Sequence, residues 1–406
     1  MQIHPFRALR PGPEHAAQVA SVPYDTVSAA EARVLALGNP DSFLHVVRPE
    51  IDLPPKTDAH SEAVYATAAA NFRDFQTRGI LVREDEPCLY VYRQKMGAHV
   101  QVGLVACCRV EDYERNVIRK HEKTRQDKED DRTRHVLELN ANAGPVFLTY
   151  ADRPAIDARL AEIQRETPLF HFTAPDAVVH TVWRVPRGSV LADAFEAVPV
   201  AYIADGHHRA AAAARAGRTR REANPAHRGD EEYNWFLAVL FGAQQLKILP
   251  YNRCVHDLNG MREADFLAAV RERFTVAEGV PAAPPRQRQV SMYLGGRWYG
   301  LSWREPPTED PVAALDVSIL QDNLLKPVLG IDDPRTSTRI DFIGGIRGTA
   351  ELEKLIDSGQ GAVAFSMYPV TVAEMMAIAD ADRIMPPKST WFEPKLRSGL
   401  IVHTLD

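Results

Sequence analysis

The 406-residue chain has few cysteines, no long apolar run and no excess of basic residues. Its four cysteines form no Cys-x-x-Cys pair, and Cys107 and Cys108 lie in the apolar run GLVACC, which favours buried thiols over a disulfide or a metal site. No apolar run reaches the roughly 20 residues that a membrane helix needs. The N-terminal segment MQIHPFRALRPG also lacks the apolar centre of a signal peptide. We therefore expect a reduced, cytoplasmic protein with no membrane partner.

The charge balance also narrows the function. A general nucleic-acid binder needs a basic surface, whereas this chain has a formal net charge of −6, so we expect no nucleic-acid partner. The chain is long enough for two or three domains with a large core. A basic pocket inside an acidic protein still permits an acidic or neutral small-molecule substrate.

The stretch Ala201–Gly217 predicts a strand, a tight turn and a helix in direct succession. Ala201–Ile203 is apolar, Asp205 and Gly206 favour the turn, and the alanine-rich run that follows favours a helix. Gly217 is placed to end this helix, because glycine adopts a left-handed backbone without strain. The first helical turn would then contain His207, His208 and Arg209.

Cations in that first turn are unexpected. The N-terminus of a helix has unpaired N–H groups and a positive dipole end, so it favours acidic side chains. An anion bound there would explain the pattern, because the Gly206 amide, the imidazoles of His207 and His208 and the Arg209 guanidinium would converge on phosphate oxygens. The alternative is a buried turn whose histidines bond backbone carbonyls.

The charged stretch from Val110 to His135 carries a second set of candidate residues. Its HEKTR segment lacks the second histidine of the His-Glu-x-x-His zinc motif. On a helix, Arg125, Lys128 and Arg132 would share one face that can hold phosphates, and Glu122 would be near enough to act as a base. A solvated helix face explains the same residues equally well.

Two loops add further candidates. Near the C-terminus, Pro386 and Pro387 fix the chain before Lys388, Ser389 and Thr390, whose ammonium and hydroxyl groups suit a phosphate or carboxylate. A structural proline turn is the alternative. Near the N-terminus, Ser28 and Glu31 predict a capping box, which leaves Tyr24 and Asp25 unexplained at the mouth of a strand-to-helix turn.

The rest of the chain alternates predicted strands and helices. We expect strands up to Val22 and over 43–50, a helix over 61–78, and a hairpin that turns at Met96 and Gly97. The proline-rich segment Pro281–Gln289 reads as a linker or a long loop. We expect two domains, residues 1–255 with the DGHHR motif and residues 256–406 with the MPPKST loop.

Several long segments occur in an order that resembles a known family. They are VPYDTVS, NPDSFLHVVRPE, LYVYRQ, VEDYERNVIRKHEKTRQDKEDDR, ANAGPVFLTY, ADGHHR and MPPKSTWFEPKLRSGL. Together they resemble the bacterial family catalogued as domain of unknown function 1015. DGHHR itself resembles the phosphate-binding signature of the ParB/sulfiredoxin-like superfamily, most closely the Asp-Gly-His-x-Arg of the free serine kinases. The chain is far longer than those kinases.

The resemblance implies an α/β (α+β) protein with a ParB/sulfiredoxin-like core, a mixed sheet and a C-terminal α/β portion that packs back on the site. It implies a small-molecule kinase that uses ATP or ADP with Mg²⁺ and acts on a small hydroxy metabolite, with free serine as the leading acceptor. It also favours site roles for the charged stretch, for Tyr24 and Asp25, and for the MPPKST loop.

The implied roles fall into three groups. The catalytic and metal-binding group comprises Asp205, which would hold Mg²⁺ or orient the acceptor, with Glu122 as the base and His121. The phosphate-binding group comprises Gly206, His207, His208, Arg209 and Arg125. The substrate-binding group comprises Tyr24, Asp25, Arg132, Lys388, Ser389 and Thr390. A phosphatase acting on phosphoserine and a nucleotide-dependent regulatory switch are the alternatives, and a homodimer is compatible with each.

Overall fold

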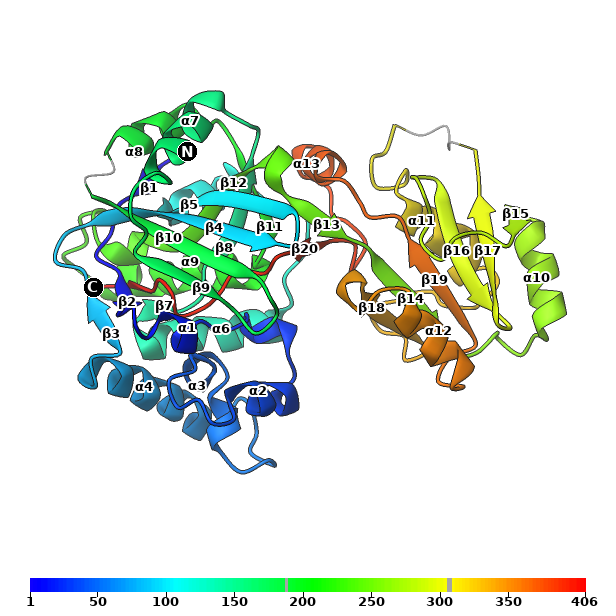
Figure 1. Ribbon diagram of the computed structural model, residues 1–406, viewed down its shortest axis with the longest axis horizontal. Helices are drawn as coiled ribbons and strands as arrows, with labels where there is room; N and C mark the ends of the chain where they lie inside the picture. The colour runs from blue at the N-terminus through cyan, green and yellow to red at the C-terminus, as the bar shows by residue number, and fades with distance from the viewer. Residues whose placement is uncertain (187–188, 305–308) are drawn as a thin grey trace. The chain divides into compact units, whose positions relative to one another are not determined.

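The computed structural model describes residues 1–186, 189–304 and 309–406 (Figure 1). The chain forms two compact units, of which the first comprises Met1–Leu246 together with Pro394–Asp406 and the second comprises Lys247–Glu393. This division lies before the expected boundary at residues 255 and 256. The chain end belongs to the first unit because it pairs there: β21 (His403–Thr404) pairs with β7 (Ala141–Asn142), and Val402 forms a bridge with Leu9.

A mixed sheet forms the centre of the first unit, and the mixed α/β class is confirmed. Two strand pairs, β11 with β6 and β12 with β8, are parallel, whereas the others are antiparallel. Among the described residues the strand order is β6 (Ile118–Arg119), β11 (Ala201–Asp205), β8 (Val146–Tyr150), β12 (Trp235–Gly242), β5 (His99–Arg109), β4 (Cys88–Met96), β10 (Val179–Pro186) and β9 (Phe170–Thr173), with β1 (Ile3–His4) beside β5.

Helices cover this sheet. Helix α9 (His207–Ala223) packs on β8 and β12, α6 (Gln126–Leu139) packs on α9, and α4 (Glu62–Thr77) packs on α6. In Figure 1 the sheet lies between this helical stack and the pair α7 (Pro154–Ile163) and α8 (Ser189–Glu196). The remaining elements of the unit are β2 (Leu9–Pro11), α1 (Ala16–Val19), η1 (Tyr24–Thr26), α2 (Ala29–Ala36), α3 (Leu44–Val47), η2 (Pro49–Asp52), β3 (Leu81–Arg83), α5 (Val110–Glu114), η3 (Glu232–Asn234) and η4 (Ala243–Gln245).

Several local predictions are confirmed, and two predicted strands are wrong. Ser28 and Glu31 form the capping box that begins α2, and the β4–β5 hairpin turns at Gly97. The strand predicted over 43–50 is instead α3 followed by η2, since its apolar residues are buried against α4 and packing overrides β propensity. The strand predicted up to Val22 is helix α1 followed by a single bridge between Ser21 and Ser398.

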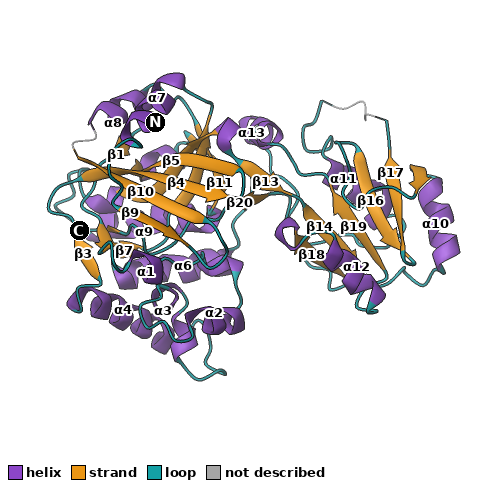
Figure 2. Cartoon of the chain, in the orientation of Figure 1, coloured by secondary structure: helices purple, strands orange, loops and turns teal. Residues whose placement is uncertain are grey.

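The second unit is also of mixed type (Figure 2). Helix α12 (Ala350–Asp357) packs on strands β14, β16 and β19 of an antiparallel sheet. The order of that sheet is β15 (Thr275–Glu278), β17 (Arg297–Ser302), β16 (Gln289–Leu294), β19 (Val363–Met367), β14 (Tyr251–Val255) and β18 (Ile340–Gly344). The other elements are β13 (Lys247–Leu249) paired with β20 (Trp391–Glu393), α10 (Glu263–Arg271), α11 (Asp316–Leu320), the π-helical turn η5 (Gln321–Leu325), η6 (Gly345–Arg347) and α13 (Val372–Asp380).

None of the helices in the described ranges combines the length and the apolar character that crossing a bilayer requires.

Candidate functional site

The turn between β11 and α9 has the predicted strand–turn–helix geometry. Asp205 ends β11, Gly206 is the N-cap with φ +93°, and α9 begins at His207. Only glycine adopts this φ readily. A Cβ at position 206 would also lie 2.9 Å from the Cζ atom of Arg209, so the guanidinium packs directly on the turn.

The helix continues past its predicted end. Gly217 lies inside α9, which runs to Ala223, so its assignment as the helix-ending residue is wrong. A Cβ at Gly217 would lie 2.4 Å from the carbonyl oxygen of Tyr233, and glycine is therefore required by close packing rather than by backbone conformation. Small buried side chains on the same helix, including Ala210 and Ala213, let α9 approach the sheet closely.

Arg209 is a buried cation between two carboxylates. Its Nη2 atom lies 3.7 Å from Asp25 and 3.5 Å from Asp205, and its Nη1 atom donates to the carbonyl of Pro145. Burial lowers the pKa of Arg209, but the two carboxylates more than offset this effect. Among the described residues, Nε and Nη2 have no hydrogen-bond partner, so two buried donors are open to an acceptor.

Asp205 carries a second ion pair, to the ammonium of Lys395 at 2.9 Å. Burial raises the pKa of the Asp205 carboxyl, but the charges of Lys395 and Arg209 outweigh burial and hold that pKa well below its usual range. The carboxylate is therefore ionised at neutral pH. Lys395 was not among the residues predicted from the sequence. Its local signal is a cation in the apolar C-terminal stretch that contains the buried Leu396 and Leu400.

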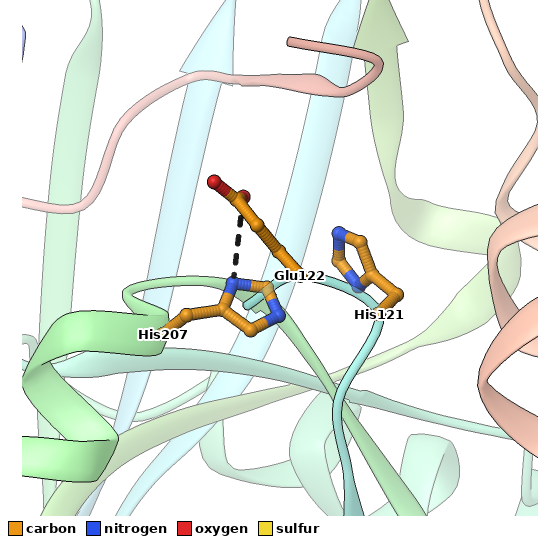
Figure 3. Close-up of side chains that lie close together, drawn as sticks. All are labelled: His121, Glu122 and His207. Atoms are coloured by element: carbon orange, nitrogen blue, oxygen red, sulfur yellow. Dashed lines mark ion pairs between the residues drawn. The ribbon is translucent and has the colours of Figure 1, made fainter. Parts of the chain in front are cut away.

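Two buried histidines and a carboxylate meet beside this turn (Figure 3). The rings of His121 and His207 are perpendicular with centroids 4.5 Å apart, and His207 Nδ1 lies 3.9 Å from the Glu122 carboxylate. Burial lowers the pKa of His121 to about 4. Burial and the neighbouring His121 also hold the pKa of His207 well below its usual range, so both imidazoles are neutral.

The structure separates Arg125 from Lys128 and Arg132, the two other cations predicted to share its helix face. Arg125 is the N-cap of α6, and its exposed guanidinium bonds Asp127, whereas its backbone N–H donates to His208 Nε2 at 3.1 Å. Its hydrogen bond to the DGHHR motif thus comes from the backbone. Arg132 instead lies over the ring of Tyr24, with Cζ 4.3 Å from the ring centroid.

Arg132 and Tyr24 also line a polar cavity of about 290 Å³. Glu50 lies 2.9 Å from Arg48, and Asp131 lies 2.7 Å from Arg132, so both carboxylates of the cavity are paired. Among the described residues, the ammonium of Lys128 makes no hydrogen bond or ion pair. The lining contains four Lys and Arg side chains, those of Arg33, Arg48, Lys128 and Arg132.

Lys388, Ser389 and Thr390 belong to the second unit. Lys388 has φ +55°, and its Nζ atom lies 5.5 Å from the ring centroid of Tyr251. The Ser389 hydroxyl donates to the carbonyl of Pro386 at 2.7 Å, as in a structural proline turn. Their assignment to the DGHHR site stays a prediction.

The comparison with protein families gives one match. A family model described as "Protein of unknown function (DUF1015)" matches residues 3–318. No curated protein matches the chain.

Solved structures similar to this chain are distant. A free serine kinase in complex with AMP is 13% identical, with coverage of 73% of this chain and 92% of that chain and a TM-score of 0.35. A conserved hypothetical protein from Pyrococcus furiosus is 12% identical, with coverage of 74% and 95% and the same TM-score. SbnI with a C-terminal truncation from Staphylococcus aureus is 10% identical, with coverage of 72% and 85% and a TM-score of 0.37.

Proposed function

This chain belongs to the family described as protein of unknown function DUF1015, and we propose that it is a nucleotide-dependent phosphotransferase acting on a small hydroxy metabolite. The observation that carries the proposal is the buried Arg209, which packs on Gly206 and keeps Nε and Nη2 without hydrogen-bond partners among the described residues. Such donors suit phosphate oxygens, which accept charge-assisted hydrogen bonds from a guanidinium.

The start of α9 would complete the phosphate site. Its first N–H groups have no intrahelical partner, and its dipole favours an anion. The Gly206 amide, His207 and His208 belong to this end of the helix. His208 Nε2 accepts the Arg125 N–H, so its Nδ1 would carry the proton of the neutral ring and serve as a donor.

Asp205 and Lys395 would act on the transferring group. Phosphoryl transfer depends on positioning and on neutralising charge that spreads over the phosphoryl oxygens, and the Lys395 ammonium supplies such a charge. The donor set fits Mg²⁺ in part, because Mg²⁺ takes one or two carboxylates along with substrate phosphates, and Asp205 and Asp25 both face Arg209. Bound Mg²⁺ would neutralise charge on the nucleotide phosphates.

Glu122 would be the general base. Its side chain is about half exposed (48%), so an acceptor hydroxyl can reach the carboxylate. It would take the proton of that hydroxyl as the hydroxyl oxygen bonds to the terminal phosphorus of the nucleotide. The bond from that phosphorus to the bridging oxygen breaks at the same time, and the nucleotide leaves one phosphate shorter. The role of base needs a carboxylate within hydrogen-bond reach. The neighbouring His121 and His207 are neutral donors or acceptors that can hold the carboxylate in place.

The anionic end of the acceptor would bind in the 290 Å³ cavity lined by Tyr24 and Arg132. The four Lys and Arg side chains of the lining outnumber its two carboxylates, Glu50 and Asp131, and this surplus of positive charge suits an acceptor that bears a carboxylate or another anionic group. Free serine is the leading candidate. The proposal keeps Lys388, Ser389 and Thr390 as substrate-binding residues, and it predicts that Lys388→Ala raises the acceptor KM.

The same phosphate site would serve a phosphatase if water replaced the acceptor hydroxyl. A regulatory switch would instead use an apolar partner surface, and a homodimer is the partner to test. The exposed apolar side chains of α2 and the residue after it, Val34, Leu35 and Leu37, are where that surface would be sought.

The test is to incubate the purified protein with ATP or ADP, Mg²⁺ and a pool of hydroxy metabolites including serine, and to identify products by mass spectrometry. We expect one phosphorylated metabolite. Arg209→Ala should abolish it, whereas Arg218→Ala, an exposed arginine farther along α9, should not. Release of phosphate from phosphoserine without nucleotide would favour the phosphatase, and absence of both product and nucleotide binding would refute the proposal.

A further inference from the structure

The His121, Glu122 and His207 side chains converge because two parallel strands end side by side. β6 and β11 pair with Arg119 opposite Tyr202, and His121 and His207 each follow the end of their strand by two residues. One ligand atom from each of the three side chains lies within 4.8 Å of the others (Figure 3). The motif HEKTR lacks a second histidine locally, and the fold supplies one from α9.

We propose that His121, Glu122 and His207 form a binding site for a divalent transition-metal ion, of which Zn²⁺ is the representative. Two imidazoles and one carboxylate suit Zn²⁺ and related ions, whereas Mg²⁺ prefers oxygen ligands. Three protein ligands with an open fourth position are the arrangement of catalytic rather than structural zinc sites. Its nitrogen-rich ligand set differs from the oxygen ligands by which Asp205 would hold Mg²⁺.

A second observation points to a ligand. The His207 side chain is only 5% exposed, yet its Nε2 atom has no hydrogen-bond partner among the described residues. A buried polar atom left unpaired costs free energy, so it implies either strain or a missing partner. His121 hydrogen-bonds the backbone of Ile203, the kind of outer contact that orients a metal-ligating imidazole.

The three ligand atoms have to approach one another to hold a metal ion. Zn–N distances of about 2.0–2.1 Å with tetrahedral angles place ligand atoms about 3.3 Å apart. His207 can offer either ring nitrogen: Nδ1 lies 3.9 Å from the Glu122 carboxylate, and Nε2 is the buried atom without a partner among the described residues. The three ligand atoms lie within 4.8 Å of one another, so they have to approach by up to about 1.5 Å, and the half-exposed Glu122 side chain can supply part of that movement.

Metal binding at this site does not depend on the proposed phosphotransferase activity, but one expected effect of the metal does. While the Glu122 carboxylate is bound to a metal ion, it cannot take the proton of the substrate hydroxyl. Zn²⁺ at this site would therefore inhibit phosphoryl transfer, and a chelator would restore it.

The experiment uses the full-length chain, stripped with a chelator and dialysed against Zn²⁺ or Co²⁺. We expect metal analysis to find one ion per chain and the visible spectrum of bound Co²⁺ to indicate a low coordination number. We also expect Zn²⁺ to raise the Tm. Excess Mg²⁺ should leave the Co²⁺ spectrum unchanged. Glu122→Ala and His207→Ala should each weaken Zn²⁺ binding at least about 10-fold and abolish the Tm rise.

His15→Ala, which removes a partly exposed histidine outside the cluster, is the matched control and should keep the site. If all the variants bind Zn²⁺ as the wild type does, the ions sit on surface histidines and the proposal is overturned. Glu122→Ala keeps the test decisive even where His207→Ala fails to fold, because Glu122 is half exposed. Calorimetric titration with ADP in the absence of Zn²⁺ tests the proposed function separately.

Discussion

The Asp205 carboxylate and the Lys395 ammonium lie 2.9 Å apart although 190 residues separate them in the sequence. The pair exists because the last thirteen residues, Pro394–Asp406, belong to the first unit, where Lys395 meets the end of β11. Both side chains are mostly buried, so the contact is protected from screening by salt. The chain end thus contributes a charge to the candidate site.

Lys395→Met tests this contact, because methionine keeps the apolar part of the side chain and removes the charge. Asp205 would keep its contact with Arg209, at 3.5 Å. We expect a loss of about 1–3 kcal/mol in the free energy of unfolding and a drop of about 10²-fold in phosphotransferase turnover. Urea unfolding and product assays measure the two effects. Lys354→Met, at an exposed lysine, should change neither. Wild-type turnover in Lys395→Met would remove Lys395 from the mechanism.

Gly206→Ala tests the packing of Arg209 on the turn. Alanine at φ +93° is strained, and its Cβ would meet the guanidinium at 2.9 Å. The control is Gly229→Ala, where φ is +97° but no heavy atom lies within 4 Å of the added Cβ. Both variants should lose about 1–2 kcal/mol of stability from backbone strain. Only Gly206→Ala should also weaken nucleotide binding, by at least about 10-fold. Equal nucleotide affinity in the two variants would contradict the phosphate site.

Glu122→Gln tests the general base. The amide keeps the size of the side chain but cannot accept the proton, so turnover should fall about 10²–10⁴-fold while nucleotide affinity is retained. Glu111→Gln, at a similarly exposed glutamate, is the control. If Glu122→Gln turns over normally, the base is another carboxylate, and Asp205 and Asp25 are the next candidates.

The pH dependence of stability should report His180, which the C-terminal segment holds neutral. Its Nε2 atom accepts from Arg397 at 3.2 Å and its Nδ1 atom bonds the Tyr92 hydroxyl at 2.7 Å. Burial and the charge of Arg397 lower the pKa of His180 to about 3. As pH falls below about 6.5, His180 binds a proton in the unfolded chain but stays neutral in the folded chain, so the free energy of unfolding decreases.

For one such histidine the slope is about 1.4 kcal/mol per pH unit. His180→Gln, whose amide can keep both hydrogen bonds, should therefore reduce the slope of unfolding free energy between pH 6 and pH 4 by about that amount. Urea titrations at several pH values measure it. An unchanged slope would show that His180 does not control this dependence.

Local sequence was sufficient wherever short-range physics decides the structure. The apolar run Ala201–Ile203 predicts β11, and Gly206 with the alanine-rich run predicts the turn and the start of α9. The Ser28–Glu31 capping box predicts the start of α2. The cations in the first turn of α9 also marked the candidate phosphate site, because their disagreement with the helix dipole is visible in the sequence.

Tertiary structure decided the rest, because ion pairs and close packing depend on which segments the fold brings together. Packing placed Gly217 inside α9, turned 43–50 into helix, and set Asp25 beside Arg209. Strand order brought His207 to His121 and Glu122, and the returning chain end brought Lys395 to Asp205. No local propensity encodes these contacts, since each joins residues whose separation along the chain far exceeds the reach of a helix or a turn.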